Sequence, residues 1–140
     1  MVIDHIGIVV GSLEKGIEDW ERTFGYGQMT DIVVNTRQGV RVVFLAKRDS
    51  LPVKLIQPVD EDSPAFGLAR KGGGLHHLCF KTRDMKDEIR RLRDLGMRVI
   101  AGPEPGEAFE NENIAFLSAK QGLNIELIDT DKRAGRHPLD

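Results

Sequence analysis

Apolar and polar positions alternate along the chain in short segments with two different periods. The opening segment "VIDHIGIVV" is rich in β-branched residues and predicts a strand over residues 2–10. Apolar residues then recur at helical spacing between a candidate N-cap, Ser12, and a candidate stop, Gly25. These are Leu13, Ile17, Trp20 and Phe24. We expect a helix here, with Trp20 on its buried face.

Three more strands complete the first half of the pattern. "MTDIVVN" (29–35) predicts a weak strand, and "QGVRVVFLA" (38–46) and "PVKLIQPV" (52–59) predict two strong ones. The interval from Asp60 to Gly74 is polar and rich in glycine. We expect this interval to connect two halves of the chain, as irregular structure with at most a short helix.

The same order of elements then begins again. "GLHHLCFKT" (74–82) predicts a strand, and Asp84 is a candidate N-cap for a helix that ends near Gly96. The apolar face of that helix would carry Met85, Ile89, Leu92 and Leu95. Three strands follow, over "MRVIAG", "NIAFLSA" and "LNIELID", with a turn at Gln121 and Gly122. Each half therefore contains a strand, a helix and three strands.

This repeat predicts an α+β fold in which two paired βαβββ modules form a cup-shaped mixed sheet. We expect one domain of 140 residues, with module 1 at about 1–59, a linker at 60–73, module 2 at about 74–130 and a tail at 131–140. For the charged tail we favour disorder over a position across the opening of the cup. The acidic segment 102–113 is interpreted as a solvated loop, with a place over the mouth of the cup as the alternative.

A constant offset relates the two halves. His5 and His77 are 72 positions apart, and so are Lys54 and Glu126. The strand neighbours of Lys54 and Glu126 are apolar and can pack against a helix, so Lys54 and Glu126 point to the other face of the sheet. If a pseudo-twofold axis relates the modules, all four side chains then meet at one site. His76 aligns with Asp4, so we expect it on the other face of the strand from His77, packed or at the strand edge.

Two histidines and one carboxylate form a suitable ligand set for a divalent transition metal. The alternative interpretation, that each of these side chains is a solvated residue on an exposed sheet face, is the weaker one because the offset matches. Cys79 shares the strand face of His77, and we expect it to be a small core residue more than a residue of the cup.

Composition narrows the classes of function. The formal net charge is −2, which gives no general attraction to nucleic acid or to an anionic membrane. No apolar run has the length of a membrane span, and the N-terminal segment is interpreted as a strand rather than a signal peptide. With the single cysteine Cys79 no disulfide can form within the chain, which fits a reducing cytoplasm.

Three segments together resemble a known family. "DHIGIVV", "GGGLHHLCFKTRDM" and "IAFLSAKQGLNIELID" are similar to the vicinal oxygen chelate superfamily (glyoxalase, bleomycin resistance protein and dioxygenase), over roughly residues 1 to 130. "SPAFGLARKGGGLHHLCF" resembles methylmalonyl-CoA epimerases within it. The resemblance implies a cup around a divalent metal (Co, Ni, Zn, Mn or Mg) held by His5, His77 and Glu126.

Lys54 departs from the pattern of that family. The fourth ligand position is normally Glu or Gln, whereas a protonated lysine offers only hydrogen-bond donors. Either three ligands and water hold the metal, or the ammonium group of Lys54 replaces the metal and pairs with Glu126. Arg41 is a candidate for a further positive charge. Gln57 is a poor substitute ligand because it lies on the opposite strand face from Lys54.

The resemblance implies proton transfer next to a carbonyl group. A metal, or Lys54 in its place, would stabilise an enolate oxygen, and Glu126 is the candidate base, although a second glutamate base is not apparent. We expect an isomerase that acts on a small anionic or thioester substrate, in the cytoplasm and as a homodimer. The alternatives are a lactoylglutathione lyase like glyoxalase I and a non-catalytic protein that binds antibiotics. Whether the cup closes within one chain or between two stays open at this point.

Overall fold

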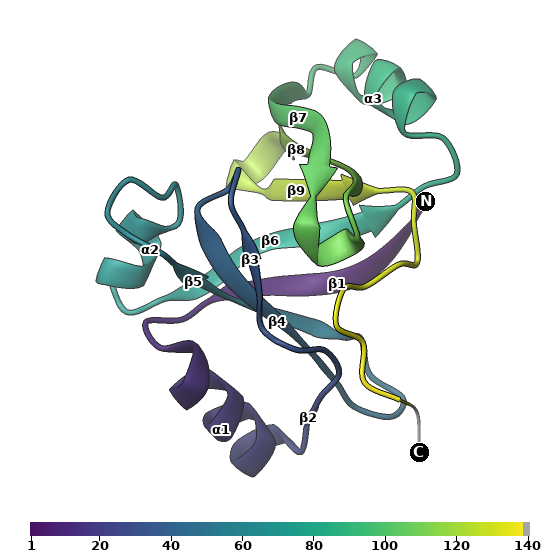
Figure 1. Cartoon of the computed structure of the whole chain (residues 1–140). Coiled ribbons are helices and arrows are strands. Elements are labelled where there is room, and N and C mark those ends of the chain that lie inside the picture. Colours follow the sequence, from purple (N-terminus) through teal and green to yellow (C-terminus); the bar gives the residue numbers. More distant parts are fainter. Residues whose placement is uncertain (139–140) are drawn as a thin grey trace.

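The computed structural model describes residues 1–138, which form one continuous mixed sheet with helices packed on it (Figure 1). The sheet has nine strands in the order β2-β4-β5-β1-β6-β9-β8-β7, with β3 paired to β4. The helices over residues 1–138 are too short or too polar to cross a membrane. The α+β fold class and the paired modules predicted from the repeat are confirmed.

The first half contains β1 (Val2–Val9), α1 (Leu13–Phe24), β2 (Gly27–Gln28), β3 (Val33–Asn35), β4 (Val40–Ala46) and β5 (Val53–Pro58). A short helix, α2 (Phe66–Arg70), lies in the connection. The second half contains β6 (Gly74–Lys81), α3 (Met85–Asp94), β7 (Arg98–Gly106), η1 (Glu107–Phe109), β8 (Glu112–Ser118), η2 (Lys120–Gly122) and β9 (Asn124–Ile128).

The two halves have equivalent strand pairings, and they meet where β1 runs antiparallel to β6. β1 pairs in parallel with β5, and β6 pairs in parallel with β9. In the first pairing Gly7 lies opposite Lys54, and in the second Cys79 lies opposite Glu126. Since each residue of the second pair is 72 positions after its counterpart in the first, the register inferred from the sequence is confirmed.

Because side chains alternate along each strand, the sheet has a helix face, on which α1 and α3 pack, and an inner face on the opposite side. On the helix face, α1 packs on β4 and β5 with Leu13 buried and Trp20 half-buried, and α3 packs on β8 and β9 with Leu92 buried. Ser12 and Asp84 accept hydrogen bonds as N-caps, as predicted. The inner face carries a separate apolar cluster that includes Phe44, Ile56 and Phe109. Lys54 and Glu126 are on this inner face, away from both helices.

Three segments differ from the sequence-based expectations. The interval 29–35 forms only the short strand β3 after an isolated bridge at Thr30, because Asp31 bonds to the tail instead of to a neighbouring strand. The acidic segment 102–113 is not a solvated loop, since β7 continues to Gly106, η1 follows it, and the side chain of Phe109 is fully buried.

The expected disorder of the tail is wrong for residues 131–138. The backbone of Ala134 donates to Ala108, that of His137 donates to Met29, and the side chain of Arg133 is buried. In Figure 1 the tail runs from the end of β9 past β1 towards β2. The prediction for residues 139 and 140 lies outside the described residues. The side chain of His137 is partly exposed at the surface, where its Nε2 lies 2.8 Å from Asp31 Oδ1.

Candidate functional site

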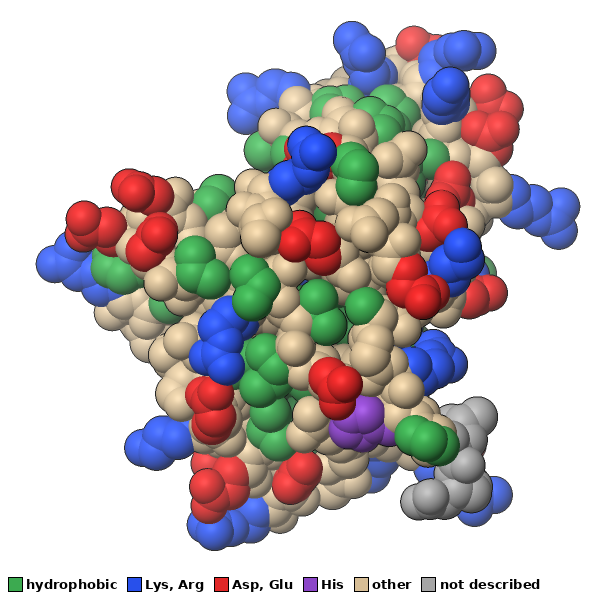
Figure 2. All heavy atoms as spheres, viewed as in Figure 1, with side chains coloured by type: hydrophobic (Ala, Val, Ile, Leu, Met, Phe, Trp, Pro, Cys, Tyr) green, Lys and Arg blue, Asp and Glu red, His purple; other side chains and the backbone are tan. Residues whose placement is uncertain are grey.

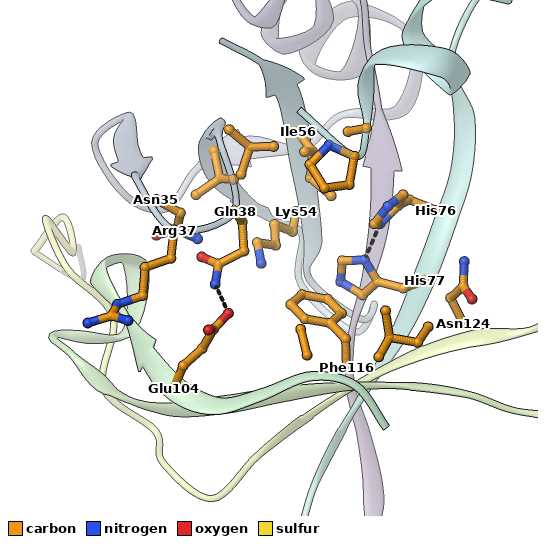
Figure 3. Close-up of a pocket in the computed structure, with 16 residues that line it drawn as sticks. Asn35, Arg37, Gln38, Lys54, Ile56, His76, His77, Glu104, Phe116 and Asn124 are labelled. Carbon is orange, nitrogen blue, oxygen red and sulfur yellow. Dashed lines mark hydrogen bonds between the residues drawn. The ribbon is translucent and has the colours of Figure 1, made fainter. Parts of the chain in front are cut away.

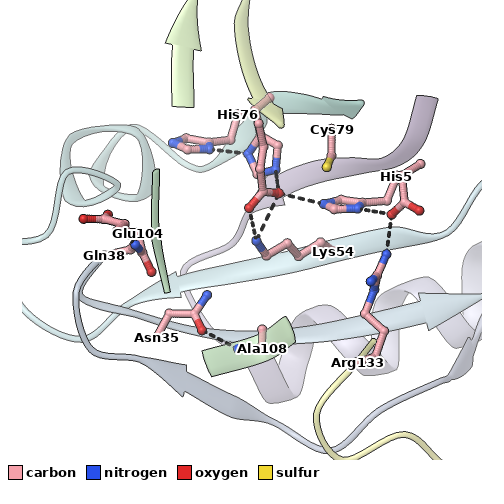
Figure 4. A network of polar contacts seen from close by, with 12 residues as sticks. His5, Asn35, Gln38, Lys54, His76, Cys79, Glu104, Ala108 and Arg133 are labelled. Atoms are coloured by element: carbon pink, nitrogen blue, oxygen red, sulfur yellow. Dashed lines mark hydrogen bonds and ion pairs between the residues drawn. The ribbon is translucent and has the colours of Figure 1, made fainter. Parts of the chain in front are cut away.

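The four side chains selected by the repeat meet in one buried cluster (Figure 4). His5 Nε2 lies 3.0 Å and His77 Nε2 lies 3.1 Å from the same oxygen, Glu126 Oε1. Lys54 Nζ donates to Glu126 at 3.4 Å (Oε1) and 3.2 Å (Oε2). The exposed fractions are 0% for His5, 1% for His77, 2% for Lys54 and 0% for Glu126. The cluster therefore has charged groups away from water, where they interact strongly.

Glu126 is ionised in this cluster. Burial by itself would raise the pKa of Glu126, but the ammonium group of Lys54 and the hydrogen bonds with His5 and His77 outweigh it and hold the pKa well below its ordinary range. Burial lowers the pKa of His77 to about 4, against the opposing effect of Glu126, so His77 is neutral near pH 7. A neutral imidazole is the form that binds metals.

An anchored carboxylate orients His5. Asp4 Oδ2 lies 2.7 Å from His5 Nδ1, and the guanidinium of Arg133 donates to the same oxygen. Burial would raise the pKa of Asp4, but its contacts with His5 and Arg133 lower it, so this carboxylate only accepts hydrogen bonds. Asp4 therefore fixes the orientation of the imidazole ring of His5, with Nε2 directed at Glu126.

Both histidines of the "HH" pair reach the inner face, so the prediction for His76 is wrong. Gly7 pairs with His77 and Ile8 pairs with Leu75, which makes His76 the extra residue of a β-bulge. A bulge interrupts the alternation of the strand and re-aims a side chain. The Nδ1 atoms of His76 and His77 are 2.7 Å apart. Asp4 is the extra residue of a second bulge, at the equivalent position of β1.

Small residues make room for the two histidine rings. Gly7 is opposite His77 on the neighbouring strand, and a Cβ atom at Gly7 would lie 2.3 Å from His77 Cε1. At the equivalent place Cys79 is opposite His5. Cys79 is fully buried in the inner-face cluster, and burial and Glu126 raise the pKa of its thiol well above the ordinary value. The prediction that Cys79 is a small core residue is confirmed.

A cavity of ≈ 270 Å³ lies beside the cluster (Figure 3). Its walls come from both halves of one chain, so the cup closes within the chain. His76 and His77 lie on one side of it and Arg37, Gln38 and Glu104 on the other. Apolar side chains form much of the remaining wall, namely Val40, Val42, Ile56, Ala65, Ile100 and Phe116. Lys54 lines the cavity, whereas His5 and Glu126 are not among its lining residues and lie behind Lys54 and His77.

Three donors suit a divalent metal. One nitrogen of His5, one of His77 and one carboxylate oxygen of Glu126 all lie within 4.8 Å of one another. The Nε2 atoms of His5 and His77 both point at the anionic Glu126 Oε1, at 3.0 Å and 3.1 Å. The contact from Asp4 to the far nitrogen of His5 is typical of histidines that bind metals. These residues therefore fit a metal ion, while Lys54 offers it no ligand atom.

Two polar residues weighed from the sequence lie outside the cluster. Arg41 is on the helix face, where it donates to Glu14 at 2.8 Å and to Gln57 at 3.2 Å. The expected further charge in the cup is therefore not Arg41, because strand alternation places Arg41 with Val43 and Leu45. Gln57 shares that face and accepts from the backbone of Leu13, as expected from its position relative to Lys54.

Sequence reasoning missed the polar residues of the far wall. Gln38 Nε2 donates to Glu104 Oε1 at 2.8 Å, and Gln38 Oε1 is buried without a partner among the described residues. Arg37 lies next to this pair at the cavity. Gln38 and Arg37 belong to the turn before β4. Glu104 belongs to β7, where the two prolines of "GPEP" hide the sequence pattern of a strand. No periodicity in these segments could have identified them.

The family of the chain follows from three comparisons. Residues 4–116 match the model of the glyoxalase/bleomycin resistance protein/dioxygenase superfamily. The ethylmalonyl-CoA/methylmalonyl-CoA epimerase of Cereibacter sphaeroides is 30% identical over 131 residues, which cover 89% of this chain and 95% of that protein.

Solved structures agree with this assignment. A variant of Streptomyces coelicolor methylmalonyl-CoA epimerase in complex with 2-nitronate-propionyl-CoA is 33% identical, with a TM-score of 0.81 and 99% of each chain covered. A methylmalonyl-CoA epimerase in complex with methylmalonyl-CoA and NH₄⁺ is 32% identical, with a TM-score of 0.80 and coverage of 95% of this chain and 97% of that one. With its repeat, its cup and these relatives, the chain belongs to the glyoxalase/bleomycin resistance protein/dioxygenase superfamily.

Proposed function

We propose that this chain is an isomerase of the methylmalonyl-CoA epimerase type. It moves the proton on the carbon next to the thioester carbonyl of a small anionic CoA thioester. The relatives described above are epimerases of such thioesters. The observation that carries the proposal is the buried cluster of Lys54, Glu126 and two histidines beside a mostly apolar cavity.

Proton removal next to a carbonyl leaves negative charge on the carbonyl oxygen, and a positive group near that oxygen lowers the barrier. Lys54 is the charged residue of the cluster that lines the cavity, so its ammonium group is the one available to this oxygen. A divalent metal held by His5, His77 and Glu126 would supply a Lewis acid for the same oxygen. The neighbour in complex with methylmalonyl-CoA contains NH₄⁺, which is the same kind of charged group as the end of Lys54.

We assign Glu126 as the base that takes the proton. In the described arrangement the carboxylate is a weak base, because Lys54 holds its pKa well below the ordinary range. An anionic substrate that draws Lys54 into the cavity would raise the pKa of Glu126 and open a path to its oxygens. The pairing of Lys54 with Glu126 and the turnover of substrate are thus coupled.

Epimerisation also returns a proton to the opposite face of the carbon, which requires a proton carrier on the opposite wall. Glu104 is the one carboxylate among the described residues that line the cavity. It lies across the cavity from His76 and His77, and the amide of Gln38 orients it through the 2.8 Å hydrogen bond. We assign the second proton transfer to Glu104, and the binding of an anionic part of the substrate to Arg37.

Deuterium exchange tests the function directly. Methylmalonyl-CoA incubated with the protein in D₂O should gain deuterium at the carbon between its two carbonyl groups, measured by mass spectrometry. The variants Glu126→Gln and Glu104→Gln should each lose most of this exchange. The variant Arg41→Gln is the matched control, because Arg41 is in the neighbouring strand but on the helix face. Absence of exchange with the wild-type protein, with or without added divalent metal, would overturn the proposal.

The same assay separates the two alternative functions. Isomerisation of the hemithioacetal of methylglyoxal and glutathione, without exchange of methylmalonyl-CoA, would identify a glyoxalase activity. Saturable binding of a small molecule in the cavity without turnover of either compound would identify a binding protein. That second alternative gains support from Glu126, which lies behind Lys54 and does not line the cavity.

The quaternary structure and the compartment are also proposals. We propose a homodimer, since the exposed apolar residues Val2, Ile3 and Leu75 lie on the two central strands of the sheet. We propose the cytoplasm, since the single cysteine is a buried free thiol. Sedimentation velocity tests the dimer, and a monomer at micromolar concentration would contradict it.

A further inference from the structure

Lys54 and Glu126 occupy equivalent positions in the two halves, yet Lys54 offers a positive charge where a ligand oxygen would complete a metal site. We infer that the ammonium group of Lys54 and a divalent metal compete for Glu126, so that the wild-type chain binds metal weakly and uses Lys54 as its resident cation. This inference rests on the ligand set that we propose, His5, His77 and Glu126.

The charge of the cluster is the first argument. The ammonium group of Lys54 lies 3.2 Å from the carboxylate of Glu126, and their two charges cancel. A divalent ion would add two positive charges among four residues that are each at most 2% exposed. An uncompensated charge in such surroundings carries a large desolvation cost, and two cations that share one carboxylate repel each other.

The position of Lys54 is the second argument. Its Nζ lies 3.4 Å from Glu126 Oε1, the same oxygen that both histidines contact. The ammonium group therefore already lies at the oxygen that would bind the metal. It also lies 5.2 Å from the ring centroid of Phe109 and 5.9 Å from that of Phe44, and both aromatic faces attract a cation. Lys54 is therefore held in place by Glu126 and by two rings that would give a divalent ion no ligand atom.

The inside of the cup leaves Lys54 little room to withdraw. Its backbone is near the start of β5, which lies between β4 and β1, and its partners across the sheet are Phe44 and Gly7. The direction open to its side chain is the cavity that it lines. A metal would therefore displace Lys54 into the space of the substrate.

Calorimetric titration of Co²⁺ into metal-free protein at pH 7.5 tests the inference without any substrate. Lys54→Met removes the charge and adds no ligand, and Lys54→Gln removes the charge and adds an oxygen donor. We expect at least a tenfold lower Kd for Lys54→Met than for wild type, and a further decrease for Lys54→Gln. Arg41→Gln also removes one positive charge but on the other face of the sheet, and its Kd should equal that of wild type.

Two independent readouts accompany the titration. Co²⁺ should raise the melting temperature of Lys54→Gln and leave that of wild type unchanged, because only a ligand that binds the folded state tightly stabilises it. The visible spectrum of bound Co²⁺ should show ligand-field bands from nitrogen and oxygen donors in Lys54→Gln, and these bands should be absent after the additional substitution His77→Ala.

Several outcomes would overturn the inference. Equal Co²⁺ affinities for wild type, Lys54→Met and Lys54→Gln would do so, whether all are tight or all are weak. A wild-type Kd below about 1 μM would do so even if the variants fail to fold. Because the titration contains no thioester, its failure leaves the deuterium exchange result untouched, and a failed exchange assay leaves the measured affinities valid.

Discussion

The two halves of the sheet place Lys54 and Glu126 in equivalent registers, opposite Gly7 and Cys79 respectively. The backbone pairing is equivalent at the two positions, but the two side chains have opposite charges. The pseudo-twofold therefore determines where the functional groups meet, whereas a single residue in each half determines what they can do. In this chain the difference turns a pair of equivalent ligand positions into an internal ion pair.

The bulged positions differ between the halves in the same way. Asp4 and His76 are each the extra residue beside a site histidine. Asp4 is tied to Arg133 of the tail, whose guanidinium lies about equally close to the rings of Phe44 and Phe109, with centroids at 5.0 Å and 4.7 Å. His76 has no such anchor among the described residues and lines the cavity instead. The bulged residue of the first half is thus anchored from behind, and that of the second half lines the cavity.

The largest effect is expected when the ion pair between the halves is broken. Glu126→Gln leaves the ammonium group of Lys54 buried without a counter-charge and should lower the free energy of unfolding by about 3–5 kcal/mol. Lys54→Met should cost less, because His5 and His77 can still hydrogen-bond to the remaining carboxylate. The double variant Lys54→Met/Glu126→Gln should be more stable than Glu126→Gln alone. Urea unfolding of metal-free protein measures all three, and additive costs would contradict the pairing.

The next largest effect should be the loss of stability at acid pH, which arises from His77 in the second half. The pKa of His77 is lowered to about 4 from 6.5, so the unfolded chain binds a proton between these values and the folded chain does not. Stability should therefore fall as pH falls from 6.5 to about 4, by about 3 kcal/mol in total. His77→Gln should remove this part of the pH dependence. Its remaining acid loss should come from the lowered pKa of Asp4 and Glu126 and begin only below about pH 4.5. A wild-type stability that is flat from pH 6.5 to 4 would be inconsistent with this.

A smaller difference in stability should distinguish substitutions at Gly7 and Cys79, the two small residues that make room for the histidine rings. Gly7→Ala adds a Cβ atom 2.3 Å from His77 Cε1 and should cost about 1–3 kcal/mol, since the ring must move. Cys79→Ala keeps a small side chain opposite His5 and should cost about 1 kcal/mol or less. Thermal unfolding and the shifts of the histidine ring resonances check both. Equal costs for the two variants would mean that the close approach at Gly7 does not constrain His77.

The smallest effects compare two arginines in pairs with carboxylates. Arg133 is 7% exposed and pairs with the partly buried Asp4, so Arg133→Met should cost about 1–3 kcal/mol. Arg41 pairs with Glu14, whose side chain is 63% exposed, and Arg41→Gln should cost at most about 1 kcal/mol. The urea concentrations at the midpoints of unfolding show which of the two variants loses more stability. A larger loss for Arg41→Gln would mean that the tail does not support the site.

Hydrophobic periodicity was sufficient to predict most of the strands and the two long helices, and the constant offset predicted the meeting of His5, Lys54, His77 and Glu126. The reason is that a repeat with a constant offset carries tertiary information, which a single strand does not. The bulges escaped prediction because one additional residue reverses the alternation locally, and so His76 was assigned to the wrong face. Arg133 escaped because its role depends on Asp4, 129 residues earlier in the chain. Glu104 lies within a proline-containing segment in which no strand pattern is visible, and Phe109 follows that segment.

The paired bulges indicate two positions at which a side chain can change while the fold stays the same. Each bulge adds one side chain to the inside of the cup without adding a strand, through one local shift in the register between β1 and β6. A substitution at Asp4 or His76 therefore alters the support of a histidine or the chemistry of the cavity while the architecture stays as it was. A search for new substrate preferences in this chain should therefore begin with libraries at these two residues.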